Sequence, residues 1–214
     1  MDLERYGILE KFSAYSVCVP AFLCILKFRA LNKSLWALFF YLLLCMLADY
    51  LSWVYNGSNG NFVRNGFTLF EFIFVVFIYY EQLENTKLKL ATLIVSLLFI
   101  VSCVFILTFQ KKYNSTDTTL GSIESAIISI LASSYLLIFL LDPKIVSWSK
   151  HYFYWINLGF LLYFSSGILL FLTFNFLKTC KPSTLYLIWG IHLLLNTIKN
   201  VLFATGIWMK KNTQ

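Results

Sequence analysis

The chain has 214 residues, of which 59% are hydrophobic and only 13% are charged. A soluble domain of this size carries about a quarter charged residues, so the composition excludes a water-soluble globular protein and indicates a polytopic membrane protein. The net charge of +7 does not point to nucleic acid, because most basic residues lie in short segments between apolar runs, where they set topology and meet anionic lipid. We therefore expect the lipid bilayer as a partner and no nucleic acid.

Residues 1–20 lack the positive start and the small-residue cleavage site of a signal peptide, so we expect the first span to be retained. The five cysteines form no C-x-x-C motif, and most of them lie in apolar runs. They are interpreted as small hydrophobic residues and not as disulfides or a zinc site.

A helix needs about 20 apolar residues to cross the hydrocarbon core of a bilayer. We predict an all-α, polytopic integral membrane protein: a bundle of seven transmembrane helices in one domain, 1–214, without a soluble domain. Pro20 should kink the first helix, and NGSNGN (56–61) is a predicted turn. In chain order, the predicted spans are 13–30, 35–56, 63–83, 89–109, 119–141, 152–177 and 184–209.

Positive charge predicts the orientation of the bundle. Lys27, Arg29 and Lys33 cluster directly after the first span, and the basic residues are somewhat more frequent on this side of the predicted bundle than on the other. Because basic loops stay in the cytoplasm, we expect the N-terminus outside and the C-terminus inside.

Ionisable residues lie inside several spans, where each would cost about 2.5–3.5 kcal/mol if it faced lipid. In the last span, four polar residues share one face about 100° wide: His192, Asn196, Lys199 and Asn200. In the third span, Glu71 shares a face with Arg64. With the N-terminus outside, these faces line a polar pocket that opens outward. The predicted ligand-binding residues are Asp49, Arg64, Glu71, Glu124, His192, Asn196, Asn200 and Lys199.

Structural roles remain open for several of these residues. Asn196 and Asn200 are as well suited to holding helices together as to contacting a ligand. Asp49 and Glu124 lie near the outer ends of their spans and reach interfacial water. An arginine such as Arg64 can also snorkel to the interface.

Glu71 is the hardest of the predicted residues to explain by structure alone. It is deep in its span, ionisable and on a polar face. We therefore expect a functional role for Glu71, paired with His192, Lys199 or Arg64.

Catalysis has weak support in the sequence. The chain has no H-E-x-x-H and no G-x-S-x-G motif, and we predict no metal and no cofactor. A pair of carboxylates, Asp49 with Glu71 or Glu124, remains open as an acid–base site. A retinal protein needs a lysine in the last span and a carboxylate counter-ion, and Lys199 and Glu71 are such residues. The sequence nevertheless disfavours this class.

A small transporter is the stronger alternative, because a Glu–His pair can carry protons. The first three and last three spans show no internal repeat, which a three-one-three transporter would require.

Four stretches of the chain resemble a group of small, uncharacterised seven-span membrane proteins of Bacteroidota that are often encoded beside sensor histidine kinases. The resemblance covers roughly half of the chain, and Lys199 is not part of the shared pattern. It implies a bacterial inner membrane and a sensor histidine kinase or other signalling protein as partner. The stretches are FEFIFVVFIYY (70–80), SIESAIISILASSYLL (122–137), FYWINLGFLLYFSSGILLFL (153–172) and LIWGIHLLLNTIKNVLFATGIW (187–208). The polar positions implied by the resemblance are Glu71, Glu124, Asn157, Ser166, Gly167, His192, Asn196 and Asn200.

The sequence thus favours a sensory or accessory membrane protein whose pocket binds a small molecule, a lipid or a proton. A small, proton-coupled transporter is the first alternative, and an intramembrane enzyme that uses carboxylates is the second.

Overall fold

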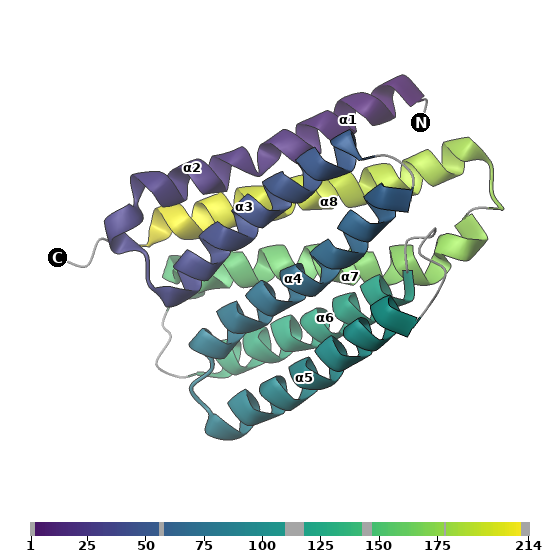
Figure 1. Ribbon diagram of the computed structural model, residues 1–214. Helices are drawn as coiled ribbons and strands as arrows, with labels where there is room; N and C mark the ends of the chain where they lie inside the picture. Colours follow the sequence, from purple (N-terminus) through teal and green to yellow (C-terminus); the bar gives the residue numbers. More distant parts are fainter. Residues whose placement is uncertain (1–2, 56–57, 110–117, 143–146, 178, 211–214) are drawn as a thin grey trace. The chain divides into compact units, whose positions relative to one another are not determined.

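The computed structural model describes residues 3–55, 58–109, 118–142, 147–177 and 179–210, without the side chains of 58–65, 107, 109, 118 and 175. Every element within these ranges is a helix (Figure 1), which confirms the all-α class. The α-helices are α1 (Leu3–Ser16), α2 (Cys18–Leu26), α3 (Lys33–Val54), α4 (Ser58–Gln82), α5 (Thr86–Phe109), α6 (Thr118–Leu141), α7 (Tyr152–Leu177) and α8 (Pro182–Met209), and the short 3-10 turns are η1 (Phe28–Ala30) and η2 (Trp148–Lys150).

Within the described residues, six helical stretches are long and apolar enough to cross a membrane. They match six of the predicted spans, and the predicted span 63–83 falls in α4, which is not one of the six. The chain therefore has the helices of a multi-pass membrane protein, whereas its orientation stays a prediction. The six stretches are Leu3–Leu26, Lys33–Val54, Thr86–Ile106, Thr119–Leu141, Tyr152–Phe174 and Pro182–Met209.

The first span differs from its predicted bounds, because helix begins at Leu3 and not near residue 13. It is interrupted at Val17, between α1 and α2. Pro20 explains the position of the break: proline has no N–H, so the Ser16 carbonyl four residues earlier loses its helical partner.

Part of the predicted turn at 56–61 is helical. Helix α4 begins at Ser58, inside that stretch, and residues 56–57 lie outside the described ranges. Serine and asparagine are favoured at helix starts, so a run of them can open a helix as well as break one.

The chain forms two compact units, of which the larger comprises residues 1–30 and 121–214. In this unit α8 packs against α7 and against α1 and α2 (Figure 1). Gly206 and Gly159 permit the close approach of α7 and α8: a Cβ at Gly206 would lie 2.7 Å from the Tyr152 carbonyl oxygen, and one at Gly159 would lie 2.8 Å from the Phe203 ring. Small residues at such crossings are the usual way to pack helices within a membrane.

The second unit, residues 31–120, contains α3, α4 and α5. Asn32 caps α3 by accepting a hydrogen bond from the Leu35 backbone N–H at 3.1 Å. Helix α4 packs against both of its neighbours, and the Phe72 and Phe99 rings lie 4.2 Å apart between α4 and α5.

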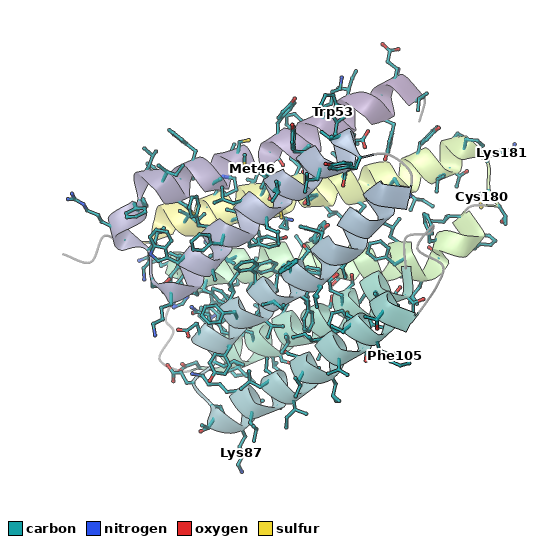
Figure 2. The ribbon with its side chains drawn as sticks, viewed as in Figure 1. Met46, Trp53, Lys87, Phe105, Cys180 and Lys181 are labelled. Atoms are coloured by element: carbon teal, nitrogen blue, oxygen red, sulfur yellow. The ribbon has the colours of Figure 1, made fainter. Side chains whose placement is uncertain are left out.

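Large apolar side chains point outward from the helices, as expected for surfaces that face lipid. Met46 and Trp53 on α3 and Phe105 on α5 are exposed (Figure 2). A water-soluble protein would cover most of such a surface, so these faces support the membrane assignment.

Candidate functional site

The polar face of α8 lies largely in the interior of the larger unit. His192, Lys199 and Asn200 are buried, and Asn196 is partly buried. The face divides between two neighbours, because His192 and Lys199 contact α7 whereas Asn196 and Asn200 contact α1.

His192 is held against α7 by a hydrogen bond and by ring stacking. Its Nδ1 lies 2.9 Å from Ser166 Oγ, and its ring stacks on Tyr163 with the centroids 4.8 Å apart. Ser166 Oγ also donates to the Tyr163 carbonyl at 2.7 Å. With its one proton used there, the hydroxyl accepts from His192, which favours the tautomer that carries a proton on Nδ1.

Lys199 lies two turns further along α8 and is only 3% exposed. Its Nζ is 4.1 Å from the centroid of the Tyr163 ring and 5.8 Å from that of Phe203. A cation over a desolvated aromatic ring is stabilised by about 2 kcal/mol, which offsets part of the cost of burying the ammonium. We name His192, Tyr163, Ser166 and Lys199 the α7–α8 cluster.

Two serines of α1 meet the two asparagines of α8. Asn196 Nδ2 donates to Ser13 Oγ at 2.9 Å, and Asn200 Nδ2 donates to Ser16 Oγ at 2.7 Å. Ser13 Oγ donates in turn to the Leu193 carbonyl at 3.1 Å. These bonds join α1 to α8, which supports the structural role that the sequence left open for the asparagines. Asn200 Oδ1 is buried without a hydrogen-bond partner in the described part of the chain.

Glu71 lies in the second unit, where its hydrogen bond comes from α3. Tyr41 Oη donates to Glu71 Oε1 at 2.9 Å, and both side chains are buried. A phenol donor stabilises a carboxylate as an acceptor, so this bond satisfies part of the hydrogen-bonding capacity of Glu71. The expected pairing of Glu71 with His192, Lys199 or Arg64 stays a prediction.

The remaining predicted residues lie on three different helices. Asp49 is exposed on α3, and Glu124 is buried on α6. Arg64 belongs to α4, but its side chain lies outside the described residues.

The structure thus brings some of the predicted residues together in pairs. Within the larger unit, His192 and Lys199 converge on one ring, and Asn196 and Asn200 bridge to α1. Asp49, Arg64 and Glu71 belong to the second unit, so a single pocket that contains all eight residues stays a prediction.

Sequence reasoning missed the partners of these residues: Tyr163, Tyr41, Ser13 and Ser16. The available signal was weak, because tyrosine and serine are common inside membrane helices. Ser166 was noticed only through the resemblance to the Bacteroidota proteins. Among the described residues, no group of three or more His, Cys, Asp or Glu side chains is placed to hold a metal ion.

No family model, curated protein or solved structure matches this chain. The likeness to the Bacteroidota proteins therefore stays a prediction, and the functional argument depends on the site itself.

Proposed function

We propose that the protein is a sensory or accessory protein of a bacterial inner membrane, with its N-terminus outside and its C-terminus inside. Its α7–α8 cluster responds to a proton or a small ligand, and a signalling protein reads the response. The observation that carries the proposal is the convergence of Lys199 and His192 on the Tyr163 ring.

The physical argument begins with the cost of such groups. An ionisable side chain within a membrane span is unfavourable, and a chain that needed only packing at these positions would use apolar residues. The cluster has two groups that could respond, the imidazole of His192 and the Lys199 ammonium. A proton on the imidazole, or an anion beside the ammonium, alters the electrostatic balance around one ring that both helices share.

Such a change would act on the packing of α8. His192 is attached to α7 through Ser166, and Asn196 and Asn200 attach the same helix to α1. A ligand that favours one arrangement of α8 over another shifts the population between them by its difference in affinity.

The end of α8 offers a route for output. Lys27, directly after α2, donates to the carbonyls of Trp208 and Lys210. A movement of α8 would therefore carry the end of α2 with it, on the side where a cytoplasmic partner would bind if the C-terminus is inside.

The test is purification of the tagged chain from its native membrane in mild detergent, followed by the activity of any signalling protein that co-purifies. We expect a near-stoichiometric partner whose activity changes after a step in external pH or added ligand. Lys199→Met and His192→Gln should keep the complex but lose the change, whereas Lys181→Met, an exposed lysine before α8, should keep both.

A transporter makes the opposite prediction. The purified chain alone would then produce flux across proteoliposomes, and the two cluster variants would abolish it. Flux by the lone chain, without a signalling partner in the native membrane, would overturn the sensory proposal.

A further inference from the structure

A groove runs between α8 and the α1–α2 stretch, within the larger unit. Its volume is about 520 Å³, and its walls are mainly apolar. Val19 and Leu23 line it from α2, and Val201, Ala204 and Trp208 line it from α8. This groove is separate from the α7–α8 cluster, because none of its lining residues belongs to that cluster.

The groove reaches a basic end of the unit. Trp208 lines the groove, and its backbone carbonyl accepts a hydrogen bond from Lys27 Nζ. The same Nζ donates to the Lys210 carbonyl at 2.9 Å and lies 5.2 Å from the centroid of the Trp208 ring. An ammonium has three N–H donors, so one donor of Lys27 remains for a ligand. Arg29 follows two residues later in η1 and is exposed.

Basic residues predominate in the segments that meet here. Lys27 in 26–30 bonds to Lys210 in 206–210, and Lys210 lies over the ring of Tyr152 in 147–152. These three segments contain no acidic residue, although Asp142 follows the end of α6 in the same unit. They carry Lys27, Arg29, Lys150 and Lys210. Such a site attracts an anion, and a groove with apolar walls attracts a hydrocarbon chain.

We propose that this groove and its basic end bind one anionic phospholipid, with an acyl chain along α8 and the phosphate at Lys27 and Arg29. An anionic phospholipid has both of the groups that the site attracts, a negatively charged headgroup and a hydrocarbon chain. A zwitterionic lipid carries the same phosphate, but its own cation offsets the attraction to lysine and arginine. The bound lipid would fasten the end of α2 to the end of α8.

The first experiment compares two lipids on the unmodified full-length chain. The protein is reconstituted with equal amounts of phosphatidylglycerol and phosphatidylcholine that have identical acyl chains, and native mass spectrometry counts the lipids that stay bound. We expect one retained phosphatidylglycerol at an excess of about tenfold over phosphatidylcholine, because each basic residue near the headgroup contributes severalfold. The excess should shrink as salt is raised. Equal retention of the two lipids would overturn the proposal, and no variant is needed for that result.

Two variants then place the lipid. Lys27→Gln combined with Arg29→Gln should reduce the excess to about threefold or less. The matched control is Lys11→Gln combined with Lys181→Gln, which removes the same charge from exposed lysines elsewhere in the unit. A preference that survives in the first variant, or falls equally in the control, contradicts the site.

Substitutions to phenylalanine test whether the acyl chain lies in the groove. Ala204→Phe places a ring among the lining residues and should reduce retention of both lipids, whereas Leu194→Phe, at an exposed position of α8 outside the groove, should leave retention unchanged. Unchanged retention in Ala204→Phe would show that the acyl chain lies elsewhere and would contradict the proposal. The sensory proposal does not depend on these lipid measurements, since the groove contains none of the residues of the α7–α8 cluster.

Discussion

The Lys199 ammonium lies 4.1 Å from the centre of the Tyr163 ring, and His192 stacks on that same ring. The ring therefore interacts with two side chains of α8 at once. A substitution of Tyr163 therefore removes a contact of Lys199 and a contact of His192 together.

Tyr163→Leu should lower the free energy of unfolding by about 2 kcal/mol or more, because the buried ammonium loses the electron-rich face of the ring. Tyr163→Phe keeps that face and should stay within about 1 kcal/mol of the unmodified protein. Equilibrium unfolding by SDS titration in mixed micelles measures both. Equal losses in the two variants would show that the hydroxyl, and not the ring, supports Lys199.

The hydrogen bond from Tyr41 to Glu71 should also be visible in stability. Tyr41→Phe removes the donor from a buried carboxyl group and should cost about 1.5–3 kcal/mol. Tyr50→Phe makes the same chemical change on the same helix at a position that is exposed, and it should change stability by less than about 0.5 kcal/mol. A Glu71→Gln background should reduce the effect of Tyr41→Phe, and full additivity of the two substitutions would argue against a direct bond.

The close approach of α7 and α8 depends on Gly206. Gly206→Ala would place a Cβ 2.7 Å from the Tyr152 carbonyl oxygen, and backbone atoms can relieve such a contact only if the helices separate. We expect a loss of about 1–3 kcal/mol. Gly7→Ala is the control, since its Cβ would meet nothing within 4 Å, and alanine is the better helix former by about 1 kcal/mol. If both variants stabilise the protein, the packing at Gly206 is looser than the structure indicates.

Substitutions of Ser16 and Asn200 should have unequal effects on stability. Ser16→Ala leaves Asn200 Nδ2 without its partner, and Oδ1 already lacks one in the described part of the chain, so a loss of about 1–3 kcal/mol is expected. Asn200→Leu removes Nδ2 together with the unpaired Oδ1 and should cost less. A double-mutant cycle in the same unfolding assay measures the coupling, and a coupling near zero would rule out the hydrogen bond.

His151 lies between α6 and α7, and burial together with the positive charge of Lys210 holds its pKa below the usual value. Lys210→Gln should therefore raise the pKa of His151. The chain has two histidines, so labelled histidine gives two signals in a pH titration by NMR, and His151→Gln identifies one of them. No change in the pKa of His151 would show that Lys210 does not act on the ring.

The lowered pKa of His151 also predicts how the stability of the protein changes with pH. Below the usual histidine pKa of about 6.5, the unfolded chain binds a proton that the folded chain does not, so stability falls as the pH drops toward the folded pKa. His151→Gln should remove this part of the pH dependence, as seen in unfolding curves across that range. Identical pH profiles for the two proteins would contradict it.

The polar face of α8 shows how much could be predicted. Spacing alone placed His192, Asn196, Lys199 and Asn200 on one side of a helix, because the helical period depends only on local backbone geometry. The partners Tyr163 and Ser13 could not be predicted in this way, since they come from helices whose register against α8 is set by close packing of glycines and large side chains. No period in the sequence encodes that register.

The sequence by itself determined that this is a chain of long apolar helices, where most of them lie, and which polar residues interrupt them. Those properties follow from transfer free energies and helical geometry, which act over a few turns. The tertiary structure decided that α1 begins at Leu3, well before the predicted start near residue 13, because the helix continues through a stretch that contains charged residues. It also decided which side chains meet: Lys199 with Tyr163, His192 with Ser166, Glu71 with Tyr41. Contacts between helices distant in sequence depend on how whole helix surfaces fit, and only the folded chain brings those surfaces together.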